Sequence, residues 1–174
     1  MGVTGAATLP AGYLSDTFRK QGSLILATAV FTFGLAYFVI GAANSYAWIL
    51  VGAGLTGLGV ALWHPGAMGT LSLNFPQRRG LALSVHGVGA SIGDTICPVI
   101  VGAVIGIFAW QDTMRWHFIP AIVGAFFIWR SLGLMRSGTT KKPTFQSYVG
   151  GLRGMFTNLQ AVIVLLSNAL VSAA

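Results

Sequence analysis

The sequence predicts an all-α integral membrane protein, and three observations carry this prediction. Charged residues make up 7% of the 174 residues and hydrophobic residues 55%, whereas a soluble domain has about 25% charged residues. Apolar runs long enough to cross a bilayer as helices recur along the chain, separated by short polar segments. Glycine is also frequent, with 24 residues, as is typical where helices pack closely in lipid.

The apolar runs define the expected membrane spans. Four complete spans are expected at residues 23–43, 46–75, 81–108 and 115–134, with a short loop at Ala109–Met114 between the last two. Residues 1–11 resemble the end of a further span, which a polar turn over Gly12–Gly22 follows, and residues 156–174 resemble the start of another. We therefore expect a piece of a larger protein rather than a self-standing four-span protein.

One carboxylate interrupts the expected span 81–108. Asp94 is its single charged side chain, about 20 Å along the helix from Leu81 and so near the bilayer middle. A charge there costs about 2.5–3.5 kcal/mol or more unless it is paired, hydrated or protonated. Gly89 and Gly93 are spaced four apart beside it, which would let another helix approach closely. The pattern favours a helix that lines a polar path inside a membrane bundle.

Glycine and proline also mark expected packing and kink positions. The span 46–75 contains Gly57 and Gly59, followed by Pro65. A proline inside a helix leaves the carbonyl four residues earlier without its donor, so a kink is expected near Ala61. Pro98 lies similarly inside the span 81–108. We expect these residues to shape helix packing.

The basic residues are distributed unequally between the two sides. With the spans as drawn, Arg115 alone lies on one side, and the other nine of the ten bases share the opposite side: Arg19, Lys20, Arg78, Arg79, Arg130, Arg136, Lys141, Lys142 and Arg153. Basic loops stay in the cytoplasm, so this side is expected to be cytoplasmic. The net charge of +7 is thereby explained without a nucleic-acid partner.

The turn Gly12–Gly22 resembles the signature between helices two and three of the major facilitator superfamily, Gly-x-Leu-small-Asp-Arg-x-Gly-Arg-Arg/Lys. The matching positions are Gly12, Leu14, Ser15 and Asp16, with Arg19 and Lys20 as the basic pair. Thr17 stands where the family usually has arginine, and the basic pair comes one residue early without its glycine. Arg79-Gly80 and residues 114–118 resemble the openings of family helices five and six.

This resemblance implies a secondary transporter and a domain organisation. Residues 1–134 would form part of the N-terminal six-helix half, beginning at the end of helix two. Residues 135–155 would be the polar, basic cytoplasmic connector, and residues 156–174 the start of helix seven in the C-terminal half. The remaining half of the same transporter is an expected partner, together with the lipid bilayer.

Two further motifs are similar to those of fosmidomycin-resistance-type exporters. They read Gly57-x-Gly59-x-Ala61-x-Trp63-His64-Pro65 and His86-Gly87-x-Gly89-x-x-x-Gly93-Asp94-x-x-x-Pro98. The chain departs from many proton-coupled drug antiporters, because Ala53 stands where those have an arginine in helix four. A coupling mechanism centred on that arginine is therefore not expected for this chain.

Three residues are the candidates for a proton or substrate path, namely Asp94, His86 and His64. A carboxylate inside a membrane can bind and release a proton, and imidazole titrates near physiological pH. The alternatives are structural: a neighbour such as Thr95 would hold Asp94 in place for packing, and the carbonyl freed at Pro65 would lock His64. Asp16 with Arg19 and Lys20 is the candidate cytoplasmic gate, as the resemblance implies; the alternative is a solvated turn.

The expected function is secondary active transport of a small molecule, with protons as the coupling ion and export by alternating access. The bacterial inner membrane is the expected location. An uptake permease for a small organic anion or another solute is the main alternative. A channel would show rings of like charge, and a membrane-embedded enzyme would need a paired nucleophile and base. Neither pattern occurs in the sequence, and no catalytic residue, cofactor or metal is expected.

The expected orientation can be tested by labelling. Single cysteines at positions 78, 112 and 141, in a Cys97→Ala background, are treated with a membrane-impermeant maleimide in intact cells. Position 112 should react from outside, and positions 78 and 141 only after the membrane is opened, because basic loops stay inside. Labelling of positions 112 and 141 from the same side would contradict this topology.

Overall fold

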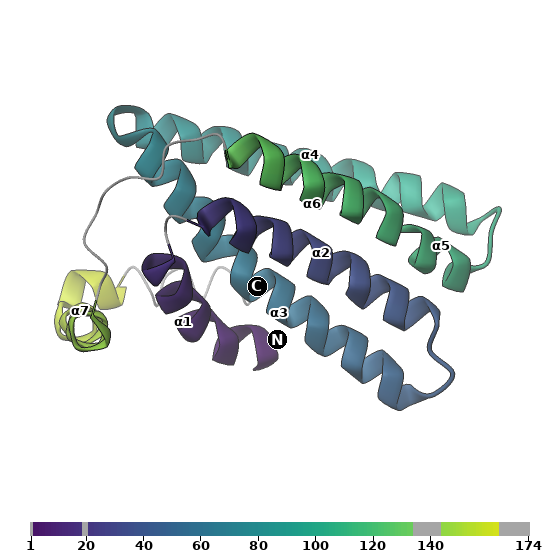
Figure 1. The fold of residues 1–174 in the computed structure, drawn as a ribbon, viewed down its shortest axis with the longest axis horizontal. Helices are drawn as coiled ribbons and strands as arrows, with labels where there is room; N and C mark the ends of the chain where they lie inside the picture. The colour runs from purple at the N-terminus through teal and green to yellow at the C-terminus, as the bar shows by residue number, and fades with distance from the viewer. Residues whose placement is uncertain (1, 19–20, 134–143, 164–174) are drawn as a thin grey trace. The chain divides into compact units, whose positions relative to one another are not determined.

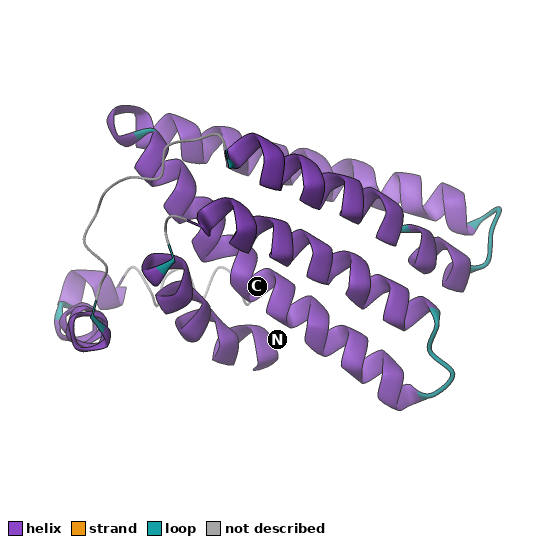
Figure 2. Cartoon of the chain, in the orientation of Figure 1, coloured by secondary structure: helices purple, strands orange, loops and turns teal. Residues whose placement is uncertain are grey.

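The computed structural model describes residues 2–18, 21–133 and 144–163 (Figure 1). Every regular element in this described part is a helix, as Figure 2 shows. The chain divides into two compact units, Met1–Thr140 and Lys141–Ala174. The all-α prediction is confirmed.

The first unit contains six α-helices and the short 3-10 helix η2 (Pro76–Arg78) among its described residues. The bounds of the α-helices are α1 Gly2–Thr17, α2 Gly22–Gly41, α3 Tyr46–Asn74, α4 Arg79–Ile105, α5 Trp110–Trp116 and α6 Phe118–Leu132. The second unit contains α7, Phe145–Thr157. Within the described residues, three segments are long and apolar enough to cross a membrane: Gly22–Gly41, Tyr46–Asn74 and Pro76–Ile105.

Helix α2 is the centre of the first unit. It packs against α3 and α6 and also meets α5, while α1 packs on α3 (Figure 1). The buried side of α2 consists mostly of small residues, and both Ala29 and Ala36 have 0% exposure. Small residues let helix backbones approach closely, and close packing is what holds helices together in lipid.

Two glycines show how close this approach is. A Cβ added at Gly34 of α2 would collide with Ala121 and come within 3.2 Å of the Phe118 ring, both on α6. A Cβ added at Gly52 of α3 would collide with Ile40 and lie 3.0 Å from the Ala36 carbonyl oxygen, both on α2. Glycine at these positions therefore sets the distance from α2 to both neighbours.

The expected polar turn over Gly12–Gly22 is wrong in its first half, because α1 is helical as far as Thr17. The helix continues through Gly12 as far as Thr17, so the connection to α2 is much shorter than expected. The Thr17 hydroxyl donates to the Tyr13 carbonyl at 2.7 Å, which satisfies both groups inside the last turn. The polar residues of this stretch thus belong to the end of a helix rather than to a loop.

The expected span 115–134 and the expected loop Ala109–Met114 are also corrected. Helix α5 begins at Trp110 within the expected loop, with Asp112 in its first turn, where a helix dipole favours an acid. The helix is interrupted at His117, and α6 then runs from Phe118 to Leu132. Pro120 explains the interruption, because it has no N–H for the Trp116 carbonyl and its ring crowds that group.

The two longest helices agree closely with the expected spans. Helix α3 continues as one helix through Pro65, and α4 continues through Pro98. The kink near Ala61 stays a prediction. Helix α4 meets α3 and α5, yet none of its residues is buried among the described parts of the chain. It therefore forms an edge of the first unit.

A matched pair of substitutions on α3 tests the glycine packing. Gly52→Ala should lower the free energy of unfolding by about 1–3 kcal/mol through overpacking against α2. Gly54→Ala is the control, because nothing lies within 4 Å of a Cβ added there, and it should be neutral or raise stability by up to about 1 kcal/mol. Thermal unfolding of the purified protein in mild detergent measures both. Equal effects of the two substitutions would contradict the packing argument.

Candidate functional site

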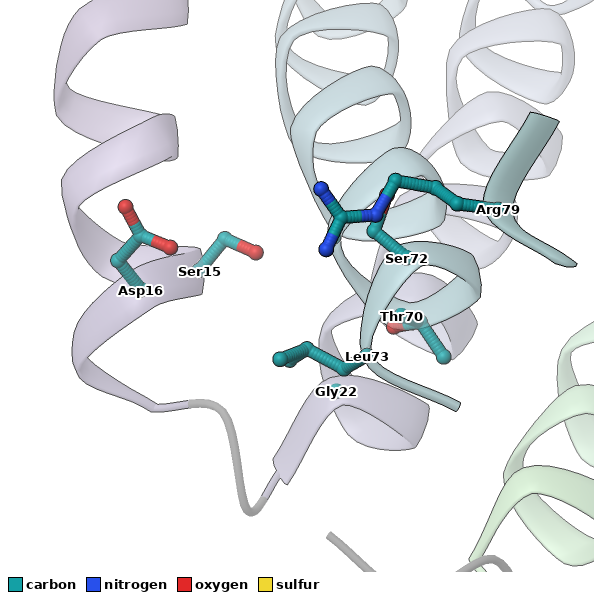
Figure 3. Close-up of a pocket in the computed structure, with 8 residues that line it drawn as sticks. Ser15, Asp16, Gly22, Thr70, Ser72, Leu73 and Arg79 are labelled. Carbon is teal, nitrogen blue, oxygen red and sulfur yellow. The ribbon is translucent and has the colours of Figure 1, made fainter. Parts of the chain in front are cut away.

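A polar cavity of about 280 Å³ lies at the end of the first unit where α1 ends and α4 begins. Ser15 and Asp16 of α1 reach it from one side and Arg79 of α4 from the other (Figure 3). Thr70 and Ser72 of α3 add hydroxyl groups to its wall. We call this space the α1–α4 cavity. It gathers an acid, a base and several hydroxyls from three different helices.

Local structure explains why the α1–α4 cavity forms. A Cβ added at Gly22, the first residue of α2, would lie 3.1 Å from the Thr70 hydroxyl, so the start of α2 sits directly on α3. The Asn74 amide donates to the Thr70 carbonyl at 2.9 Å and supports the last turn of α3. These contacts hold the end of α3 in place beside the polar end of α1.

Two of the four candidate gate residues lie in the described part of α1. Gly12 is half-buried there, and Asp16 lines the α1–α4 cavity, while their role in a gate stays a prediction. Arg19 and Lys20, the expected basic partners, lie outside the described residues. Sequence reasoning missed Arg79 as a cavity residue; the signal was its position at the start of a span. A carboxylate and a guanidinium on different helices can form a charge-assisted contact that changes when the helices move.

Asp94 lies on an uncovered part of α4. It is exposed, about 22 Å along the helix from Arg79, and no described residue pairs with its carboxylate. The Thr95 hydroxyl donates to the Ser91 carbonyl at 2.8 Å. Thr95 has one hydroxyl hydrogen and uses it within its own helix, so the alternative in which Thr95 donates to Asp94 is not supported.

The side of α4 that carries Ser84, Ser91 and Thr95 borders an open space of about 650 Å³. Asp94 is not among the residues that line this space. Nothing in the described structure lies within 4 Å of a Cβ added at Gly89 or Gly93. The expected helix packing at these two glycines therefore stays a prediction. Gly57 and Gly59 of α3, in contrast, are buried in the first unit.

The two candidate histidines lie on adjacent helices, and a ring contact of Trp63 connects their surroundings. The His86 ring lies 6.3 Å from the Trp63 ring, centroid to centroid, so Trp63, the neighbour of His64 in sequence, connects α3 to α4. The His64 Nδ1 lies 3.1 Å from the Val60 carbonyl oxygen. Because a carbonyl can only accept, Nδ1 is the donor in this contact. His64 is therefore held by the Val60 carbonyl, and not by the Ala61 carbonyl that Pro65 leaves without a donor.

The opposite end of the unit carries a different polar cluster. The Arg115 Nε donates to the Gly41 carbonyl at 2.9 Å, at the end of α2, where a helix dipole favours a cation. Arg115 also forms a 3.2 Å ion pair with Asp112. Both side chains are exposed, so that pair is worth no more than about 1 kcal/mol. This cluster fastens α5 to α2 and has the character of an anchor.

Known proteins resemble this chain along its length. The Major Facilitator Superfamily profile matches residues 1–174. The fosmidomycin resistance protein of Escherichia coli is 25% identical over 112 residues, which are 64% of this chain and 27% of that protein. An MFS-type transporter of Mycobacterium tuberculosis is 30% identical over 112 residues, 64% of this chain and 18% of that protein.

A fungal relative extends the comparison. The agnestins efflux protein of Paecilomyces divaricatus is 29% identical over 132 residues, covering 73% of this chain and 28% of that protein. The chain thus spans about a fifth to a quarter of the length of these curated relatives. No solved structure matches it. Because the family profile covers every residue and the described fold is a bundle of apolar helices, the chain belongs to the Major Facilitator Superfamily of membrane transporters.

Proposed function

We propose that this chain forms part of a secondary transporter that exports a small molecule in exchange for protons across the bacterial inner membrane. The observation that carries the proposal is Asp94, an acidic group in the middle of a 27-residue apolar helix, on a face that no described residue covers. Family membership supplies the transport function. The ionisable group at this depth is what favours coupling to protons.

The energetics of Asp94 support a proton-binding role. An ionised carboxylate at the bilayer centre costs about 2.5–3.5 kcal/mol or more, and protonation removes this cost. A transporter that exposes such a group alternately to the two sides can take a proton from one side and release it to the other.

The two histidines extend this proposal toward the α1–α4 cavity. His86 lies on α4 about 12 Å from Asp94 along the helix axis and about a quarter turn around it. Its contact with Trp63 places it level with the neighbourhood of His64 on α3. The Nδ1 of His64 is held by the Val60 carbonyl, and imidazole groups can relay protons near physiological pH. We assign both residues to the inward part of the proton path.

The names of the relatives suggest more than one kind of transport. The agnestins efflux protein favours export by its name, and another relative is named for resistance to fosmidomycin. The second candidate is uptake of a small organic anion, because a monocarboxylate transporter of Xenopus laevis is 29% identical over 102 residues, 59% of this chain. Export is our proposal because the two motifs around His64 and Asp94 resemble those of the fosmidomycin-resistance type.

Asp94→Asn tests the coupling directly in proteoliposomes of the intact transporter. Asparagine mimics the protonated acid but does not titrate. Accumulation of substrate against its gradient, driven by an imposed pH difference, should fall at least tenfold, while downhill exchange should be retained. Asp112→Asn is the matched control, because Asp112 is an exposed acid outside the spans and its loss should change flux less than twofold. If the Asp94→Asn variant concentrates substrate as the parent does, Asp94 is not part of the proton path.

Asp16→Asn tests the gate at the α1–α4 cavity. A charge-assisted hydrogen bond is worth about 1.5–3 kcal/mol, so transport velocity should fall about tenfold if the contact forms in one conformation of the cycle. Arg79→Gln should act in the same direction, since Arg79 lines the same cavity. Ser72→Ala, which keeps both charges, is the control. Velocity is measured at equal membrane abundance, and an unchanged velocity for Asp16→Asn would reduce this residue to a solvated helix end.

A further inference from the structure

Trp63 of α3 makes a ring contact that joins this helix to His86 of α4. The two ring centroids are 6.3 Å apart, and the ring planes are inclined to each other by 35°. Both side chains are half-buried, whereas most of α4 is exposed. Trp63 precedes His64 in the sequence, and the proposed proton path leaves it without a role. The contact lies at one of the points where the described chain covers part of α4.

The orientation of His86 depends on this ring contact, because no hydrogen bond sets it. The other two histidines are each held through Nδ1. The His64 Nδ1 lies 3.1 Å from the Val60 carbonyl oxygen, and the His117 Nδ1 lies 2.7 Å from the Thr113 carbonyl oxygen. No described residue forms a hydrogen bond with either ring nitrogen of His86. Within the described structure, its ring is therefore oriented by packing, and both nitrogens stay available.

The availability of both nitrogens matters for proton transfer. An imidazole that shuttles a proton accepts it at one ring nitrogen and releases it from the other. A histidine whose Nδ1 is bound to a carbonyl, as in His64, has Nε2 alone left for this exchange. A side chain that orients His86 through ring packing leaves both of its nitrogens free for a relay.

Helix α3 supports Trp63 firmly, because it is packed against α2 on both sides of this residue. A Cβ added at Gly59 would lie 3.0 Å from the Phe33 ring, and a Cβ added at Gly66 would lie 3.2 Å from Leu26, both on α2. At 100° per residue, positions 59, 63 and 66 fall within an arc of about 60°. The indole ring is therefore carried by a part of α3 whose distance from α2 is fixed.

We propose that Trp63 is a positioning residue that holds the His86 imidazole in place for proton transfer. The indole ring orients the imidazole by packing against it, and this contact occupies neither nitrogen. The proposal rests on the proposed function, in which His86 belongs to the inward part of the proton path. It goes further by separating the two histidines: His86 exchanges protons through two nitrogens, and His64 through one.

Nuclear magnetic resonance of the intact transporter tests the contact itself. Histidine is isotope-labelled, the protein is placed in lipid nanodiscs, and His86→Gln identifies the His86 signals. An aromatic ring shifts the resonances of nuclei close to it, so Trp63→Leu should move the His86 ring signals. The signals of His117, which contacts Tyr37 instead, are the internal control and should stay in place. If the His86 signals stay in place as well, the indole does not orient the imidazole and the proposal is wrong.

Uphill accumulation in proteoliposomes tests what the contact does for transport. Trp63→Leu should lower pH-driven accumulation about tenfold, because a misplacement of about 1 Å can cost up to about 100-fold in rate. Trp63→Phe keeps a flat ring and should retain most of the parental rate. Downhill exchange should be retained in both variants, which a general packing defect would not spare. Trp48→Leu is the control on the same helix, because Trp48 is exposed, and it should change accumulation less than about twofold.

The double variant of Trp63→Leu with His86→Gln shows whether the indole acts through the imidazole. If it does, the double variant should accumulate substrate as fast as His86→Gln alone, since the effects of residues in contact are not additive. Losses that multiply would overturn the proposal.

Two further outcomes are distinguished by the same set of variants. If Trp63→Leu does not reach the membrane, Trp63→Met gives the same comparison, because methionine fills irregular space. If His86→Gln accumulates substrate as the parent does, His86 is not in the proton path and the proposal fails. The Asp94→Asn assay then shows whether the proposed coupling itself survives.

Discussion

Close packing around α2 is the constraint on which the rest of the first unit depends. In lipid, burying an apolar side chain against another helix brings no hydrophobic gain, so van der Waals contact must hold helices together. Gly34 and Gly52 provide that contact by removing the atoms that would keep α6 and α3 at a distance from α2. The fixed geometry of α2, α3 and α6 then determines where α1 and α4 can sit. Both candidate sites lie at these outer helices.

Helices α2 and α4 differ in how far the described part of the chain covers them. Helix α2 has buried residues along its length, whereas none of α4 is buried by the described part of the chain. The ring contact of Trp63 with His86 is one of the links that attach α4 to α3. Asp94 and Arg79 both lie on α4, so the proposed proton site and the proposed gate are carried by one rigid element.

Much of the fold could be predicted from the sequence, because the length and hydropathy of a span are local properties. Helices α2, α3 and α4 follow the expected spans closely. Helices α5 and α7 were missed because their polar residues resemble loops by composition, and α6 is shorter than expected because of Pro120. The site was harder to predict, since it depends on how helices are rotated against each other. Helix rotation decides, for example, that His86 contacts the ring of Trp63. It also brings Arg115 to the Gly41 carbonyl, which is 74 residues away in sequence.

The polar groups at the two ends of the bundle differ in a way that follows from their partners. At the α5 end, Arg115 binds a backbone carbonyl that terminates α2, and a carbonyl at a helix end is available in every conformation that keeps the helix intact. At the other end, Asp16 and Arg79 are side chains on separate helices, with a cavity of about 280 Å³ between the elements that carry them. A contact between two such side chains depends on helix position in a way that the Arg115 contact does not. The bundle therefore has one end suited to holding its helices together and one end suited to sensing their movement.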